Sequence, residues 1–162
     1  MIDSRAKLVR EVLTDPVHIL AFGFGTGLSP VAPGTVGSLL GVALAWLTLD
    51  LGMNAQIGIA LVMLVTGIWL CGESARRLGI HDHGGIVWDE IVGMYAVLIF
   101  TPFALYPWIL AFGLFRAFDI VKPWPIRDLD HRMKGGAGIM LDDLVAALYT
   151  ALLLAFLGWL IN

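Results

Sequence analysis

Five apolar segments fill most of this chain, and they limit the folds open to it more than any other feature. Hydrophobic residues make up 59% of the 162 residues and charged residues only 14%, whereas a soluble domain carries about 25% charged residues. A single soluble core cannot bury so much apolar surface, so the composition predicts an integral membrane protein with one domain over residues 1–162. The segments are Val36–Leu51, Ala55–Cys71, Ile86–Phe100, Leu105–Phe118 and Ile139–Ile161.

The five segments predict an all-α fold, a polytopic membrane helical bundle with glycine-rich loops on the cytoplasmic side. A helix that crosses the hydrocarbon core needs about 20 residues, and only Ile139–Ile161 reaches that length. If all five span, local thinning of the bilayer or oligomerisation accommodates the shorter ones; internal helices shielded by their neighbours are the alternative, and whether all five span fully stays open. A sixth stretch, Val17–Leu28, is broken by glycines and predicts an interfacial or re-entrant element.

The basic residues fall in three groups, and a five-span topology places all three on one side of the membrane. The connections at residues 50–54 and 101–107 contain none. By the positive-inside rule the basic side is cytoplasmic, which predicts a multi-pass protein whose partner is the lipid bilayer. No basic tract indicates a nucleic acid partner, and the oligomeric state stays open. The groups are Arg5, Lys7 and Arg10; Arg76 and Arg77; and Arg116, Lys122, Arg127, Arg132 and Lys134.

Five carboxylates stand at the ends of apolar segments, where ionisable groups are costly and therefore indicate function. Asp89 and Glu90 open one segment, Asp119 closes the next, and Asp142 and Asp143 open the last. In the predicted topology all five face the cytoplasmic side. Complementing a helix dipole is the alternative role for the pair that opens the first of these segments, whereas the last pair lies deeper than capping requires.

Two of the acidic pairs repeat one arrangement, a glycine turn followed by three apolar residues and two carboxylates. The stretch HDHGGIVWDE ends at Asp89 and Glu90, and KGGAGIMLDD ends at Asp142 and Asp143. Two such half-sites facing each other would supply hard oxygen ligands that suit Mg²⁺ near a phosphate. We predict that these four residues bind Mg²⁺ and are catalytic, with Asp119 as a further ligand or as the base that orients water.

A glycine- and proline-rich stretch, Gly23–Ser38, predicts a phosphate site. Its composition forbids a regular helix over most of its length. Its end offers free N–H groups and the hydroxyls of Thr35 and Ser38, which we predict to bind substrate phosphate. A re-entrant turn capped by these hydroxyls is the alternative.

Basic and imidazole side chains complete the predicted site. Arg116 and Lys122 share a helical face with Asp119, and they either bind the substrate phosphate or pair with that carboxylate in a salt-bridge ladder. His81 and His83 are candidate catalytic residues, as ligands or general acids, with surface loop positions as the alternative.

At these motifs the chain resembles the phosphatidylglycerophosphatase A family. The similar blocks are GFGTGLSPVAPGTVGSL, HDHGGIVWDE, FRAFDIVKPWPI and GGAGIMLDD, in that order, and they cover most of residues 22–143. The resemblance implies a Mg²⁺-dependent phosphatase that removes the terminal phosphate from a membrane phospholipid, phosphatidylglycerol phosphate, to give phosphatidylglycerol. It also implies an active site that faces the cytoplasm at the bacterial inner membrane.

Other functions compete with a metal-assisted phosphatase, whose nucleophile, water or a carboxylate, is open. A cation-binding membrane carrier would also use intramembrane carboxylates, although here they gather at one face. A membrane scaffold would use the charges only to anchor helix ends. Cys71–Arg77 has the spacing of cysteine phosphatases without their glycine-rich loop, and Asp128 and Asp130 resemble an aspartate-phosphatase pair; neither is predicted to be catalytic.

Overall fold

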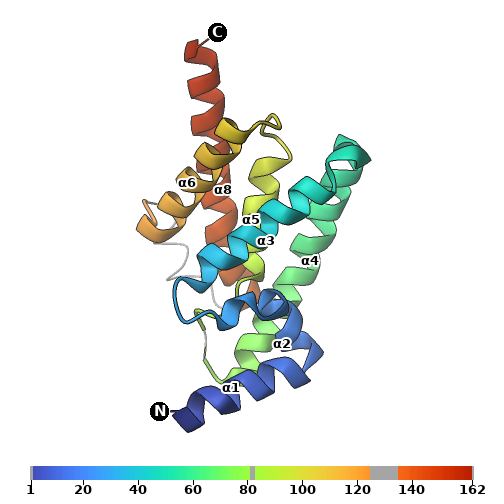
Figure 1. Ribbon diagram of the computed structural model, residues 1–162, viewed down its shortest axis with the longest axis vertical. Helices are drawn as coiled ribbons and strands as arrows, with labels where there is room; N and C mark the ends of the chain where they lie inside the picture. Colours follow the sequence, from blue (N-terminus) through green and yellow to red (C-terminus); the bar gives the residue numbers. More distant parts are fainter. Residues whose placement is uncertain (1, 81–82, 125–134, 162) are drawn as a thin grey trace.

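The computed structural model describes residues 2–80, 83–124 and 135–161, and every regular element in these ranges is helical. No strand occurs in them, which confirms the all-α prediction for this part of the chain. The two ends of the chain lie at opposite ends of the molecule's long axis (Figure 1). The elements are α1 (Ile2–Thr14), α2 (Pro16–Ala21), η1 (Gly23–Leu28), α3 (Pro33–Leu47), η2 (Leu49–Leu51), α4 (Met53–Leu78), α5 (Trp88–Leu98), α6 (Leu105–Val121) and α8 (Gly136–Ile161).

Two helices in the described ranges are long and apolar enough to cross a membrane, so the prediction of five spans is wrong. α4 and α8 each have 26 residues, which at about 1.5 Å per residue exceeds the roughly 30 Å of the hydrocarbon core. The helices α3, α5 and α6 have 15, 11 and 17 residues and fall short of the usual span. The two long helices suggest that the protein is associated with a membrane.

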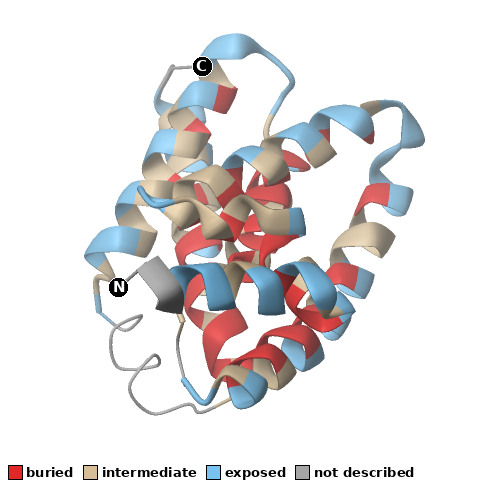
Figure 2. Cartoon of the chain, turned by 60° about the horizontal axis from the view of Figure 1, so that its bottom comes forward, coloured by how far each residue is buried: buried red, intermediate tan, exposed pale blue. Residues whose placement is uncertain are grey.

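The position of α5 explains why apolar composition overestimated the number of spans. This helix lies in the middle of the bundle and contacts α3, α4, α6 and α8 (Figure 1). Its residues Val92, Met94, Tyr95 and Val97 are almost completely buried by the protein itself, and Figure 2 shows the buried residues gathered along the middle of the bundle. A helix enclosed by protein is as apolar as one enclosed by lipid, so an apolar segment predicts burial without saying which of the two provides it.

The glycine- and proline-rich stretch forms no continuous helix, as predicted. α2 and η1 cover the predicted element Val17–Leu28, and η1 has left-handed backbone at Phe24 and Gly25, where φ is 56° and 96°. The backbone N–H of Val87 donates to the carbonyl of Ala21 at 2.9 Å. This bond ties the loop that leads into α5 to the end of α2.

Contacts with α4 fix the starts of α5 and α8. The Trp88 indole N–H donates to the Met63 carbonyl at 3.0 Å, and the missing side chain at Gly67 leaves room for that indole. Gly136 approaches α4 so closely that a Cβ there would overlap the carbonyl oxygen of Ile68. Both acidic helix starts are therefore held on the same supporting helix.

Candidate metal and phosphate site

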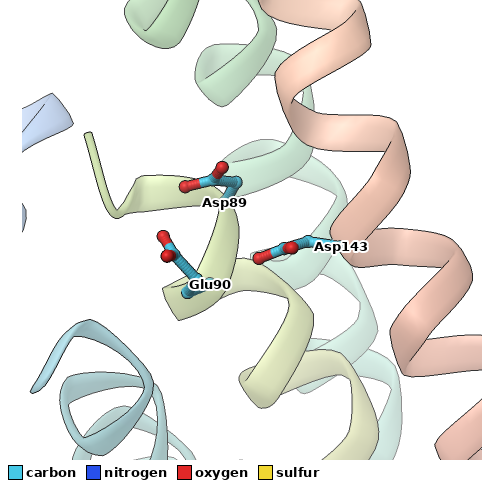
Figure 3. Close-up of side chains that lie close together, drawn as sticks. All are labelled: Asp89, Glu90 and Asp143. Atoms are coloured by element: carbon cyan, nitrogen blue, oxygen red, sulfur yellow. The ribbon is translucent and has the colours of Figure 1, made fainter. Parts of the chain in front are cut away.

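Three carboxylates from two helices converge at the start of α5. Asp89 and Glu90 lie in its first turn, and Asp143 reaches them from α8 (Figure 3). One oxygen from each of the three carboxylates lies within 4.8 Å of the other two. This group, which we call the carboxylate triad, contains three of the four predicted metal ligands.

The triad is buried and retains oxygens that no protein group satisfies. Asp89 and Asp143 expose 9% and 3% of their surface. Oδ1 of Asp89, Oε2 of Glu90 and Oδ2 of Asp143 have no hydrogen-bond partner. A buried carboxylate without a partner is costly, so these atoms point to a ligand that the protein itself does not supply.

Electrostatics at the start of α5 lead to the same conclusion. Burial raises the pKa of Asp89 well above its ordinary value, and the neighbouring Glu90 carboxylate adds to the shift. Burial also raises the pKa of Glu90 to about 8, with the Asp143 carboxylate as the next contributor. Carboxylates this close do not all ionise readily without a compensating positive charge. A donor set made only of carboxylate oxygens fits a hard divalent cation such as Mg²⁺.

Arg116 connects the triad to the end of α6 and to α3. Its Nη1 lies 2.7 Å from Oδ2 of Asp119 and 4.0 Å from Oε1 of Glu90. The same nitrogen donates to the Ser38 hydroxyl at 3.3 Å, and that hydroxyl donates to the Gly34 carbonyl at 2.8 Å. The predicted pairing of Arg116 with Asp119 is present, and the Ser38 hydroxyl, predicted to bind phosphate, is occupied in positioning the guanidinium.

Asp142 is not one of the three clustered carboxylates, although it is close enough to act on Asp89, and it forms an ion pair with Lys122. The Nζ of Lys122 lies 2.6 Å from Oδ2 of Asp142. Neighbouring positions on a helix point about 100° apart, so Asp143 faces α5 while its neighbour meets the end of α6. Lys122 has left-handed backbone, with φ 44°, at the residue after α6 ends. Its ammonium group meets α8 at Asp142.

The start of α3 lies directly against the triad. A Cβ on Gly34 would overlap Oε1 of Glu90 and would lie 3.1 Å from a terminal nitrogen of Arg116. Thr35, half-buried, lies in the same first turn. The residue before the helix, Ala32, provides no side-chain cap, so N–H groups at this helix start remain available for an anion. Only glycine permits this approach of backbone to carboxylate.

The histidine predictions have different outcomes. His81 lies outside the described residues. His83 lies in the loop before α5, where its ring packs against Phe22 with 5.4 Å between ring centroids and its Nδ1 accepts the N–H of Gly85 at 3.0 Å. In the neutral ring this bond leaves Nε2 as the hydrogen-bond donor.

The rejected phosphatase motifs do not form a site in the described residues. Cys71 is buried within α4 and lies 3.8 Å from the sulfur of Met140. Arg77 pairs with Glu73 and Asp15, so the Cys-x5-Arg segment is an ordinary helix with its arginine engaged elsewhere. The pair at residues 128 and 130 lies outside the described residues.

Comparisons with known proteins identify one family. The family model for phosphatidylglycerophosphatase A matches residues 19–158. A phosphatidylglycerophosphatase A of Escherichia coli (strain K12) is 43% identical over 150 residues, which cover 92% of this chain and 87% of the relative. One of Haemophilus influenzae is 46% identical over 142 residues, covering 86% and 87%. A Bacteroides thetaiotaomicron protein with the provisional name phosphatidylinositol-3-phosphatase is 40% identical over 153 residues, covering 89% and 94%. No solved structure matches the chain significantly.

Proposed function

Since this chain belongs to the phosphatidylglycerophosphatase A family, we propose that the carboxylate triad is the reaction centre of a Mg²⁺-dependent lipid phosphatase. The activity is that of a phosphoric monoester hydrolase, which converts phosphatidylglycerol phosphate to phosphatidylglycerol in phospholipid biosynthesis. The observation that carries the assignment of the site is the set of three buried carboxylates with unsatisfied oxygens, beside a guanidinium and an open helix start.

Asp89, Glu90 and Asp143 are the residues that would hold Mg²⁺. Their oxygens are close enough together to share one ion, and a bound cation would offset the repulsion among them. When bound, Mg²⁺ polarises phosphoryl oxygens and lowers the pKa of a bound water. Asp142, predicted as a fourth ligand, has its place at the edge of this site, where it holds Lys122 beside the incoming phosphate.

Arg116 and the start of α3 form the phosphate clamp. Arg116 is held by Asp119 and Ser38, so its planar guanidinium has a fixed orientation. A fixed positive group that faces the transferring phosphate stabilises the charge that develops on it. Thr35 and the N–H groups at the start of α3 bind the remaining phosphate oxygens. Arg116 and Thr35 are thus substrate-binding residues, and Ser38 supports the first of them.

Proton transfer involves Asp119 and His83. Asp119 lies close enough to Glu90 and Asp143 to affect their ionisation, and we assign it to orient the attacking water and accept its proton. We assign the His83 Nε2–H to donate a hydrogen bond to the departing glycerol oxygen, which takes up the proton that Asp119 accepted from water. In the net reaction water adds to phosphorus and the bond from phosphorus to the glycerol oxygen breaks. The glycerol oxygen gains the proton that the water loses.

The site faces the cytoplasm in this proposal. The basic residues of α1, the end of α4 and the end of α6 lie toward the end of the bundle that carries the triad, whereas the 50–54 and 101–107 connections lie at the other end (Figure 1). The positive-inside rule supports a cytoplasmic location for the basic end. The lipid's acyl chains can then remain in the inner membrane while the head group reaches the interface.

The proposal is tested by phosphate release from phosphatidylglycerol phosphate as Mg²⁺ is titrated into metal-stripped enzyme. We expect activity to depend on Mg²⁺ and Glu90→Gln to lower kcat at least about 100-fold. The matched control is Asp50→Asn, which removes an exposed carboxylate at the other end of the bundle and should leave kcat unchanged. Full activity of Glu90→Gln would refute the site.

The substrate is tested with phosphatidic acid and phosphatidylinositol 3-phosphate in the same assay. Phosphatidylglycerol phosphate should give the highest kcat/KM of the three lipids. Turnover of phosphatidic acid alone would overturn the substrate while leaving the triad as a phosphatase site.

A further inference from the structure

A cavity adjoins the proposed reaction centre on the side of α1. Its volume is about 380 Å³, and its walls come from α1, the segment after η1, the start of α3 and the loop before α5. Pro33 lines this cavity, and the next residue, Gly34, meets the Glu90 carboxylate. The cavity and the triad are therefore separated by little more than the first turn of α3.

The charge of the cavity wall favours an anion. Arg5 is the only charged side chain among the described residues that line it, and His83 also lines it, from the loop before α5. Another cavity lined by α1 differs, because its lining mixes acidic Glu11 and Asp15 with basic Lys7 and Arg77. Of these two cavities, only the Arg5 cavity presents a positive charge without a carboxylate among its described lining.

The polar side chains that line this cavity differ in whether another protein group already binds them. The ion pair on α1 joins Lys7 to Glu11 at 3.8 Å and does not include Arg5. The His83 Nε2–H is directed by the bond from the Gly85 N–H to Nδ1 and serves the departing glycerol oxygen in the proposed reaction, which leaves Arg5 as the group for an anion in this cavity. The Ser29 hydroxyl instead donates to the Val31 carbonyl at 2.8 Å and is not the group that would bind an anion.

Exposed apolar side chains flank the same cavity. Phe24 and Val31 expose 65% and 74% of their surface on the loop that also provides the lining residues 27–30. Left-handed backbone at Phe24 and Ala32, with φ 56° and 47°, holds this loop in a conformation that costs free energy for residues other than glycine. An apolar rim next to a basic cavity is suited to a lipid head group that arrives from the membrane surface.

We propose that this cavity binds the phosphodiester of the lipid substrate, the phosphate that is not hydrolysed, and that Arg5 is the specificity-determining residue for it. The inference rests on the proposed function of the triad. A short glycerol unit joins the two phosphates of phosphatidylglycerol phosphate, so a diester in the cavity places the terminal phosphate next to the start of α3 and Arg116. Recognition of the diester separates this lipid from phosphomonoester lipids that lack one.

The test uses two inhibitors of the full-length enzyme in mixed micelles. Phosphatidylglycerol, the product, retains the diester, whereas inorganic phosphate resembles only the group that is released. In Arg5→Ala the KM for phosphatidylglycerol phosphate and the Ki for phosphatidylglycerol should each rise about 10-fold, because a charge-assisted contact is lost. The Ki for inorganic phosphate and kcat should remain within about 2-fold of wild type.

Matched variants on the same helix complete the design. Arg10→Ala removes an exposed arginine of α1 that does not line the cavity, and it should leave all three constants unchanged. Arg5→Lys should restore part of the loss. An unchanged Ki for phosphatidylglycerol in Arg5→Ala, an equal rise in the Ki for phosphate, or no inhibition of wild type by phosphatidylglycerol would each overturn the proposal. These readouts need only an active enzyme, so their failure is distinct from a failure of Glu90→Gln to lower activity.

Discussion

The two halves of α8 are both rich in apolar residues, yet different surroundings enclose them. In the first half, Met140, Asp143 and Ala146 are buried against other helices. In the second half, Leu152 and Trp159 expose 59% and 75% of their surface, and this half extends beyond the rest of the bundle (Figure 1). The contrast shows that one apolar helix can be buried in protein at one end and expose apolar side chains at the other. Only the enclosed end can carry ionisable groups at an acceptable free energy.

The largest effect is expected at Asp143, in the enclosed half. Asp143→Asn removes a charge from the triad and should lower kcat at least about 100-fold, and it should also abolish the rise in melting temperature that Mg²⁺ causes in the wild type. Asp142→Asn is the control, because that residue pairs with Lys122. It should lower kcat about 10-fold and keep the Mg²⁺-induced rise.

Two outcomes would change the assignment of the Mg²⁺ ligands in the first half of α8. A Mg²⁺-induced rise that survives in Asp143→Asn would show that the triad does not bind the ion. Its loss in Asp142→Asn as well would make all four predicted carboxylates ligands.

Substitutions at two glycines of α8 test how closely each half packs against the other helices. Gly136→Val introduces a side chain where a Cβ already overlaps the Ile68 carbonyl, and overpacking should lower the free energy of unfolding by about 3 kcal/mol. Gly158→Ala adds its methyl group to open space and should change the stability by about 1 kcal/mol or less, in the stabilising direction. Denaturant unfolding in detergent gives both values, and equal losses would contradict the contrast between the halves.

The smallest effect is expected from an exposed leucine in the second half. Leu152→Ala should change the free energy of unfolding by no more than about 0.5 kcal/mol, since few protein contacts are lost. Met140→Ala in the first half should cost about 2–5 kcal/mol, because it empties a filled core position. A large loss at Leu152 would mean that another part of the protein covers this surface.

The sequence was informative about which side chains gather and less informative about how they pair. Asp89, Glu90 and Asp143 were expected to converge because their helix starts follow similar glycine turns, and the structure brings them together. The spacing of the two acidic pairs is alike, so it did not indicate that Asp142 would form an ion pair with Lys122. That ion pair forms because the end of α6 places Lys122 beside α8, and no local sequence pattern encodes this arrangement.

The membrane topology shows a second limit. The glycines before α5 predicted a loop, but the apolar run after them could be buried in protein or in lipid. That choice depends on the neighbours of Val92 and Tyr95, which come from distant parts of the chain. The partnership of Ser38 with Arg116 depends in the same way on where α3 meets α6.

The triad also sets an order for the enzyme's biogenesis. Asp89 and Glu90 come from α5, but their third partner lies on α8, and α6 must be made before it. While the ribosome is still translating the intervening residues, the nascent protein holds two of the three carboxylates and an incomplete triad. In the proposed mechanism, catalytic competence is therefore acquired late, when α8 packs against α4.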